Sequence, residues 1–190
     1  MFTPMLGRHQ LDNLAAAVGA VEMCARLEGL SLRRQRVAEC LREFRMPARL
    51  ELLQRSPAVL LDVAHTVEST DALLAALQTH FPGRPVRVVF GCSSSKDARG
   101  MLARFKGRCV TFTATQADMS RAMPVDETLQ AARDVQVAAP EHLKAVADSR
   151  EAAQDAIEGA APGDVVCITG SFFTAGEILG ERMKGEGGNG

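Results

Sequence analysis

The sequence contains no tryptophan and no tyrosine, and only eight of its 190 residues are phenylalanine. Proteins that bind single-stranded nucleic acid usually stack the bases on aromatic side chains, so this composition argues against that role. The sequence also lacks an excess of positive charge, because 23 Asp and Glu balance 22 Lys and Arg. Binding to a phosphate backbone depends on a basic surface. We therefore expect no nucleic acid as a partner.

Long apolar runs are missing as well. No run approaches the roughly 18 or more apolar residues of a membrane-spanning helix. The N-terminal stretch MFTPMLGRHQ lacks the charged and apolar segments of a signal peptide. These absences predict a cytoplasmic protein with no membrane partner. The cysteines, at positions 24, 40, 92, 109 and 167, form no CxxC pair and are odd in number, which argues against a disulfide framework and against a zinc site.

Sequence motifs of complete enzymes are also absent. A nucleotide-hydrolysing P-loop needs GxxxxGK[ST], and the segment GCSSSKD has one glycine and the wrong spacing. Neither GxSxG nor HExxH occurs, and no GxGxxG follows the first predicted strand. By itself the chain has no recognisable catalytic motif.

The first part of the chain is predicted to be helical. Apolar residues recur at intervals of three and four over 11–27 and again over 32–44, which is the spacing of one helical face. Asp12 or Asn13 can begin the first helix, and Gly29 follows its end. No strand is predicted in this part.

The pattern changes after Pro47, which disfavours helix and cannot donate a backbone hydrogen bond. We expect a domain boundary here, with residues 1–45 forming one unit, 46–184 an α/β domain, and 185–190 a flexible tail. Strands and amphipathic helices alternate after the boundary, which is typical of a mainly parallel sheet flanked by helices. The predicted strands are 50–55, 58–63, 86–90, 109–113, 135–138 and 164–169; the predicted helices are 67–80, 97–106, 126–133, 148–160 and 172–184.

The stretch VLLDVAHT, at 59–66, reads as a buried strand that carries Asp62 and His65 to its C-terminal end. In an open parallel sheet, ligands bind at that end. Two simpler interpretations remain open at this point. Asp62 can be only the N-cap of the next helix, and His65 can be an ordinary exposed or hydrogen-bonded imidazole.

The loop GCSSSKD follows the strand predicted over 86–90. Its hydroxyl groups, Ser94 among them, lie with Lys96 just before a helix N-terminus, where an anion such as phosphate or carboxylate is favoured. The alternative is a solvated turn in which Asp97 caps the helix. The last predicted strand ends in a similar loop, TGS, whose Ser171 can cap a helix or offer its hydroxyl to a ligand.

These segments together resemble one family in order and across nearly the whole chain. The matching strings are GRHQLDNLAAAVGAVE, MPARLELLQ, LLDVAHTVES, VVFGCSSSKDARGML, TQADMSRAMP and VVCITGSFFTAGE. They resemble the C-terminal part of folylpolyglutamate synthase / dihydrofolate synthase, of the Mur ligase superfamily. The resemblance implies a Rossmann-like C-terminal domain, preceded here by the last helices of an ATPase domain.

The resemblance also implies an ATP-dependent ligase that activates folate as an acyl phosphate and joins it to L-glutamate. In the family, an N-terminal ATPase domain carries the P-loop and the magnesium ligands. Since that part is absent from this sequence, the resemblance implies a fragment or split form that is inactive alone and has the ATPase domain as its partner. ATP and Mg²⁺ are the implied cofactors, with no metal ligands in this chain.

The resemblance assigns roles to particular residues. Those implied to contact ATP are Asn13, Arg49 and Asp62; those implied to contact glutamate are His65 and Ser171; Lys96 and Asp97 match a KD pair in the family, with Ser94 beside them. Arg49 suits a phosphate contact, because a guanidinium binds phosphate oxygens in a bidentate manner.

One departure from the family pattern concerns the residues after His65. Bacterial members usually have Asn-Pro there, whereas this chain has Thr66 and Val67. Thr66 can still cap the helix, but an amino-acid ligase of cell-wall synthesis from the same superfamily remains an alternative. The ending TGSFFTAGE favours the folate branch. A third possibility is a stand-alone nucleotide-binding or interaction module without catalysis.

Overall fold

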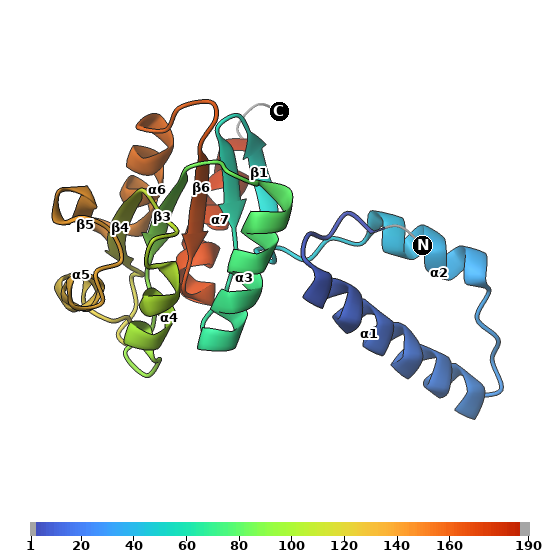
Figure 1. Ribbon diagram of the computed structural model, residues 1–190. Helices are drawn as coiled ribbons and strands as arrows, with labels where there is room; N and C mark the ends of the chain where they lie inside the picture. The colour runs from blue at the N-terminus through green and yellow to red at the C-terminus, as the bar shows by residue number, and fades with distance from the viewer. Residues whose placement is uncertain (1–2, 187–190) are drawn as a thin grey trace.

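The computed structural model describes residues 3–186, and the side chains of residues 3–180. Figure 1 shows an α/β body with two helices that project from one side of it. The strands are β1 (Glu51–Arg55), β2 (Ala58–Leu61), β3 (Val86–Phe90), β4 (Thr111–Gln116), β5 (Leu143–Asp148) and β6 (Val165–Thr169). The helices are α1 (Arg8–Leu27), α2 (Arg34–Glu43), α3 (Val67–His80), α4 (Ala98–Phe105), α5 (Val125–Asp134), α6 (Ser149–Glu158) and α7 (Phe172–Glu186), with a short 3₁₀ helix at Pro140–His142.

The six strands form a single sheet in the order β1-β2-β6-β3-β4-β5. Every neighbouring pair is parallel except β1 and β2, which are antiparallel and adjacent in sequence. Parallel strands need crossover connections, and the helices that supply them cover the sheet. The predicted fold class, a mainly parallel sheet flanked by helices and preceded by two helices, is therefore confirmed.

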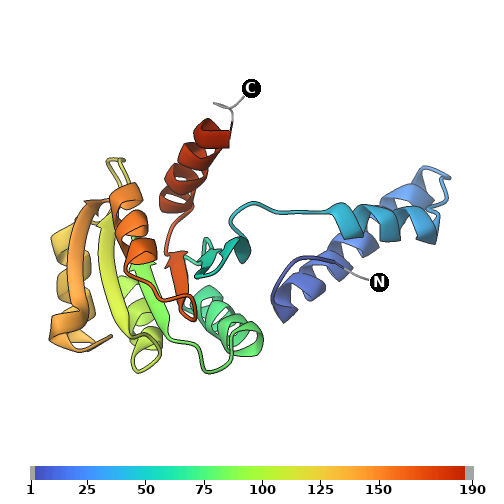
Figure 2. The same cartoon turned by 90° about the horizontal axis from the view of Figure 1, so that it is seen from above.

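Helices cover both faces of the sheet (Figure 2). One face packs against α3, α4 and α5, and its core includes the fully buried rings of Phe90, Phe105 and Phe112. The other face packs against α6 and α7, where small residues such as Ala152 and Ala153 approach the strands closely. The strand order brings the C-terminal ends of β2, β6 and β3 together at one edge of this sandwich.

Helix α3 has the predicted bounds and the predicted inward face. Leu73, Leu74 and Leu77 are buried, and burial of each such side chain contributes about 1.5–3 kcal/mol. The helix begins at a capping box, in which the hydroxyl of Thr66 accepts from the backbone N–H of Ser69 at 3.2 Å. The prediction that Thr66 caps this helix is confirmed.

The strand predicted over 135–138 is wrong. Those residues form the turn that follows α5: Gln136 adopts a left-handed backbone with φ 56°, and the N–H of Val137 donates to the carbonyl oxygen of Ala132. Their apolar side chains cover the end of a helix. The strand itself, β5, starts at Leu143, and it lies at the sheet edge, where its half-exposed residues give little apolar signal.

The start of the first helix also differs from the prediction. It begins at Arg8 after Gly7, whose φ is 92°, and not at Asp12 or Asn13. At the other end of the chain, α7 includes residues 185 and 186 of the predicted tail, and the remainder, 187–190, lies outside the described residues.

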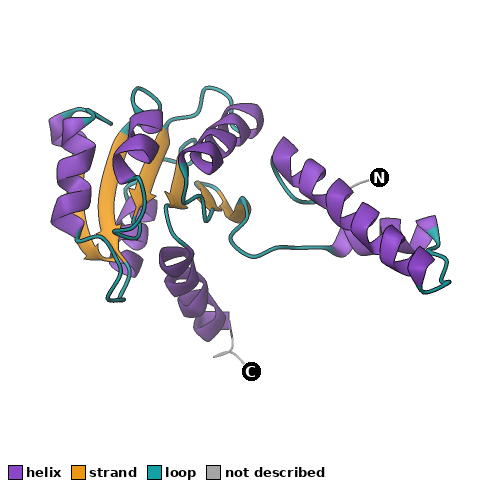
Figure 3. Ribbon diagram, turned by 90° about the horizontal axis from the view of Figure 1, so that it is seen from below, coloured by secondary structure: helices purple, strands orange, loops and turns teal. Residues whose placement is uncertain are grey.

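The helices α1 and α2 project away from the sheet (Figure 3). No residue of α2 is buried, and in α1 only Gln10 and Ala25 are. Large apolar side chains are consequently exposed throughout this part: Leu11, Val21, Met23, Leu27, Leu30, Leu32, Phe44 and Met46. Within residues 3–186, no helix combines the length and the apolarity needed to cross a membrane.

Candidate functional site

The loops that follow β2, β3 and β6 lie against one another at the C-terminal edge of the sheet. The N–H of Asp62 donates to the carbonyl oxygen of Ile168, and the N–H of Gly91 donates to that of Thr169. Gly170 has φ 111°, and a Cβ at this position would lie 2.6 Å from the carbonyl oxygen of Gly91. Only glycine permits this close crossing of two loops.

Asp62 is buried, and both of its carboxylate oxygens accept backbone hydrogen bonds. Oδ2 accepts from the N–H of Leu50 at 2.9 Å, and Oδ1 from the N–H of Ala64 at 2.8 Å. Burial has the largest effect on the pKa of Asp62 and raises it. The two hydrogen bonds and the nearby Arg49 and His9 lower this pKa, but by less. The cap of α3 is Thr66, so Asp62 is not a helix cap.

Arg49 lies at the centre of an unusual turn just before β1. The residues on either side, Ala48 and Leu50, both have left-handed backbones, with φ 54° and 51°. Carboxylates hold both: the N–H of Ala48 donates to Oε2 of Glu51 at 2.8 Å, and that of Leu50 donates to Asp62. Non-glycine residues rarely adopt this conformation, and such backbones are often found at functional sites.

The guanidinium of Arg49 lies over the ring of Phe172, with Cζ 5.2 Å from the ring centroid. Among the side chains of residues 3–180, no carboxylate forms an ion pair with it. Phe172 is the first residue of α7, and half of its side chain is exposed. The charge of Arg49 is thus open to an anionic ligand.

His65 contacts the same phenylalanine ring. The two ring centroids are 5.2 Å apart, with the planes tilted by 52°. Nδ1 of His65 lies 2.9 Å from the carbonyl oxygen of Val63, which can only accept, so Nδ1 carries the proton. In the part of the chain with described side chains, Nε2 has no hydrogen-bond partner. This nitrogen can therefore meet a substrate group.

Ser171 lies between this ring and the close crossing at Gly170. Its hydroxyl oxygen accepts from the N–H of Phe173 at 3.1 Å, so it acts as a cap for α7, as one of the two sequence interpretations held. We call Arg49, Asp62, His65, Ser171 and Phe172 the strand-end cluster. The structure brings four predicted site residues into this cluster, together with Phe172, which the sequence reasoning did not single out.

Asn13 lies outside the strand-end cluster, exposed on α1. The N-terminal end of that helix does lie near the cluster, because a Cβ on Gly7 would lie 2.6 Å from Cδ1 of Leu50, the neighbour of Arg49. The side-chain nitrogen Nε2 of Gln10, a buried residue, is 3.0 Å from Nε2 of His9. Residues three and four apart share a helix face, so Asn13 lies on the same face as these two. The sequence reasoning missed His9 and Gln10, although they belong to the same string as Asn13.

The loop after β3 makes internal contacts. The hydroxyl of Ser94 donates to the carbonyl oxygen of Ala122 at 3.2 Å, and Asp97 caps α4 by accepting from the N–H of Gly100 at 2.8 Å. The capping interpretation of Asp97 is therefore the one the structure shows. Lys96 and Asp97 line a separate hollow of about 330 Å³ beside α5. Within residues 3–180, no hydrogen bond or ion pair joins Ser94, Lys96 or Asp97 to the strand-end cluster.

The strand-end cluster is a poor site for Mg²⁺. Its only carboxylate, Asp62, has both oxygens bonded to backbone N–H groups, and Oε2 of the nearby Glu51 accepts from Ala48. The described residues contain no group of three or more His, Cys, Asp or Glu side chains that could hold a metal ion. A divalent cation would need ligands from outside these residues.

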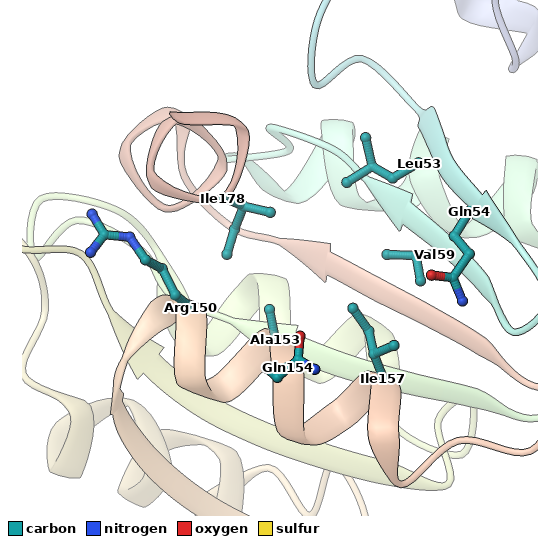
Figure 4. Close-up of a pocket in the computed structure, with 8 residues that line it drawn as sticks. All are labelled: Leu53, Gln54, Val59, Arg150, Ala153, Gln154, Ile157 and Ile178. Carbon is teal, nitrogen blue, oxygen red and sulfur yellow. The ribbon is translucent and has the colours of Figure 1, made fainter. Parts of the chain in front are cut away.

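An apolar hollow of about 230 Å³ lies on the other face of the sheet, between α6, α7 and the β1–β2 edge. Figure 4 shows that the side chains of Ile178, Ile157 and Val59 surround it, while the guanidinium of Arg150 points away. The residues that line it are Leu53, Gln54, Val59, Arg150, Ala153, Gln154, Ile157 and Ile178. It contains none of the predicted site residues.

Comparison with known proteins gives a consistent family. Residues 48–172 match the family described as Mur ligase, glutamate ligase domain. A UDP-N-acetylmuramoyl-L-alanyl-D-glutamate–2,6-diaminopimelate ligase of Nostoc sp. is 32% identical over 187 residues, which cover 94% of this chain and 36% of that protein. A folylpolyglutamate synthase of Lacticaseibacillus casei is 27% identical over 183 residues, covering 96% of this chain and 40% of that protein.

Solved structures agree with this result. The folylpolyglutamate synthase of Mycobacterium tuberculosis, in complexes with ADP and AMPPCP, superposes with a TM-score of 0.81 and 26% sequence identity, over 95% of this chain and 41% of that one. The present chain therefore spans about two fifths of the length of these relatives.

Proposed function

The chain belongs to the Mur ligase, glutamate ligase domain family, and we propose that it is the C-terminal part of an ATP-dependent ligase that joins L-glutamate to a folate. One observation carries this proposal: Arg49 and His65 contact the same ring of Phe172. Cζ of Arg49 and the ring centroid of His65 each lie 5.2 Å from the centroid of that ring. Arg49 is the proposed contact to the nucleotide phosphates and His65 a proposed contact to glutamate. Their proximity would put the two reacting groups next to each other.

In the proposed reaction, the folate carboxylate takes the γ-phosphoryl group of ATP, which gives an acyl phosphate and releases ADP. The amine of glutamate then attacks the acyl carbon, and formation of the amide bond displaces phosphate and releases a proton. Arg49 would offset the negative charge that spreads over the phosphate oxygens. Nε2 of His65 and the hydroxyl of Ser171 would orient glutamate. Correct positioning of the two reactants alone can lower such a barrier by about 7–11 kcal/mol.

Asp62 and Asn13 are the remaining proposed ATP contacts. Since the described contacts of Asp62 occupy both of its oxygens, its contact to nucleotide would be in addition to, or in exchange for, one of these hydrogen bonds. Asn13 would face the nucleotide from α1, on the same helix face as His9. Ser94, Lys96 and Asp97 are less direct candidates, because they contact a different part of the surface.

We further propose that residues 1–45 belong to the end of an ATPase domain and that 46–184 form the C-terminal domain. The exposed apolar side chains of α1 and α2 support this proposal, because a domain that packs on them would bury them. That ATPase domain would carry the P-loop and the Mg²⁺ ligands, and the chain alone would be inactive. The reaction would take place in the cytoplasm, where ATP is available.

The test combines this chain with a P-loop ATPase domain of the family and measures ADP release that depends on both folate and L-glutamate. His65→Ala should reduce turnover by at least about tenfold, as removal of a substrate-orienting group does. His142→Ala, in the surface 3₁₀ helix, is the matched control and should have no effect. Unchanged turnover in His65→Ala would refute the assignment of His65. Absence of any ADP release would favour a binding module without catalysis.

A second candidate is a cell-wall ligase of the same family. It is favoured by the 32% identity with the diaminopimelate ligase of Nostoc sp.. The same assay distinguishes the two when the substrates are exchanged for a UDP-muramoyl peptide and diaminopimelate. Turnover with that pair and none with folate and glutamate would overturn the folate proposal.

A further inference from the structure

We propose that Phe172 is a positioning residue that holds the guanidinium of Arg49 and the imidazole of His65 beside each other, and so keeps the phosphate and amino-acid contacts in register. This inference rests on the proposed function for the roles of Arg49 and His65. The contacts of Phe172 themselves are independent of it.

The first step concerns the side chain of Arg49. The left-handed turn at 48–50 fixes its backbone, but a long arginine side chain still has many rotamers. Within the described residues, no carboxylate pairs with it. The ring of Phe172 is the contact that the structure gives the guanidinium, and a cation over an aromatic face is attracted to it.

The second step concerns His65. Its imidazole is oriented on one side by the hydrogen bond from Nδ1 to the carbonyl oxygen of Val63. The ring of Phe172 limits rotation of the His65 imidazole on its other side, because the two ring centroids are 5.2 Å apart and the planes are tilted by 52°. The imidazole is thus held against the same ring as the guanidinium.

The third step concerns Phe172 itself, which must be rigid to act in this way. It begins α7 directly after Ser171, whose hydroxyl accepts from the N–H of Phe173. The hydroxyl of Thr174 donates to the carbonyl oxygen of Gly91 at 3.2 Å and ties this turn of the helix to the loop that follows β3. The ring is therefore anchored by its backbone although 51% of the side chain is exposed.

The neighbouring Phe173 provides a matched control. It is also about half exposed, at 46%, and its ring lies 6.0 Å from Cζ of a different arginine, Arg121. Leucine at either position keeps an apolar side chain on the same turn of α7. A difference between Phe172→Leu and Phe173→Leu therefore reports the contact with Arg49 and His65, and not a general effect on the helix.

The experiment uses the 190-residue chain and NMR spectroscopy, with ADP as the probe. In Phe172→Leu, the Nε–H resonance of Arg49 and the ring resonances of His65 should lose their aromatic ring-current shifts, and ADP should bind about two- to fivefold more weakly. Phe172→Tyr should restore both properties. Phe173→Leu should leave both unchanged.

The outcomes separate this inference from the proposed function. Unchanged Arg49 and His65 resonances in Phe172→Leu would overturn the role of Phe172, as would ADP affinity equal to that of the wild type. If the wild-type chain alone binds no ADP, the affinities are measured after addition of the P-loop ATPase domain, and absence of ADP binding there overturns the proposed nucleotide contact. The resonances of the 190-residue chain then decide by themselves whether Phe172 positions the two side chains.

Discussion

The carboxylate of Asp62 accepts a hydrogen bond from the backbone N–H of Leu50, 2.9 Å away and 12 positions earlier in the sequence. This contact joins the end of β2 to the left-handed turn that presents Arg49. Removal of the Asp62 carboxylate would therefore also release that turn, so a loss of the proposed ligase activity in Asp62→Ala would reflect a displaced Arg49 as much as the loss of the proposed ATP contact. Variants at the turn itself separate the two effects.

Glu51 provides the first such variant. Its Oε2 accepts the N–H of Ala48, so Glu51→Ala should reduce the free energy of unfolding by about 1 kcal/mol and shift the backbone resonances of 48–50. Glu51→Gln keeps an acceptor oxygen and should cost less than half of that. Chemical denaturation measures both. Equal destabilisation by the two variants would show that the hydrogen bond does not hold the turn.

The close crossing at Gly170 predicts a large effect of one methyl group. Gly170→Ala should reduce the free energy of unfolding by more than about 2 kcal/mol, because its backbone is left-handed and its Cβ would meet the carbonyl oxygen of Gly91. Gly176→Ala is the control in α7, the helix that follows this loop; a Cβ there meets open space, and the variant should stabilise by up to about 1 kcal/mol. Thermal or urea denaturation tests the pair. A Gly170→Ala variant as stable as the wild type would contradict this reading of the crossing.

The buried carboxyl of Asp62 predicts a specific pH dependence. Burial raises its pKa in the folded state, so the folded state binds this proton more tightly than the unfolded chain does. The contribution of Asp62 to stability is therefore complete below the unfolded pKa and decreases as pH rises through the folded pKa. The measurement is the difference in unfolding free energy between the wild type and Asp62→Asn from about pH 3 to about pH 7, and this difference should fall with pH.

Asp164 gives the opposite sign and serves as the comparison. The hydrogen bond from Arg87, 2.7 Å long, lowers the pKa of Asp164. Its contribution to stability is present above the unfolded pKa and is lost as pH falls through the folded pKa. The difference between the wild type and Asp164→Asn should therefore rise with pH over the same range. Parallel slopes for the two aspartates would refute the assignment for Asp62.

The exposed apolar side chains of α1 and α2 predict self-association of the isolated chain. Val21, with 55% of its side chain exposed, lies on the predicted apolar face of α1, and Val21→Lys should shift the chain toward monomer. Val110→Lys changes an exposed valine of the α/β body, directly before β4, and should have little effect. Sedimentation at increasing concentration is the measurement. A wild-type chain that stays monomeric would contradict the prediction.

Much of the fold followed from local patterns in the sequence. Periodicity predicted α3 and β3 with their observed bounds, and it predicted that Thr66 could cap α3. These features depend on residues close together in the chain, so the sequence expresses them directly. The edge strand β5 was misplaced, since a half-exposed strand carries a weak apolar signal and the turn that follows α5 carries a stronger one.

The sequence by itself determined the strand–helix alternation and the polar residues that end β2 and β6, because side-chain periodicity and turn chemistry are local properties. Only the tertiary structure decided that α1 begins beside Leu50, that Asp62 and Glu51 hold the turn around Arg49, and that one phenylalanine ring contacts both Arg49 and His65. Apart from the Glu51–Ala48 hydrogen bond, which is local, these contacts join residues that are far apart in the chain. They depend on the order of strands in the sheet and on the close crossing at Gly170, which no local pattern encodes.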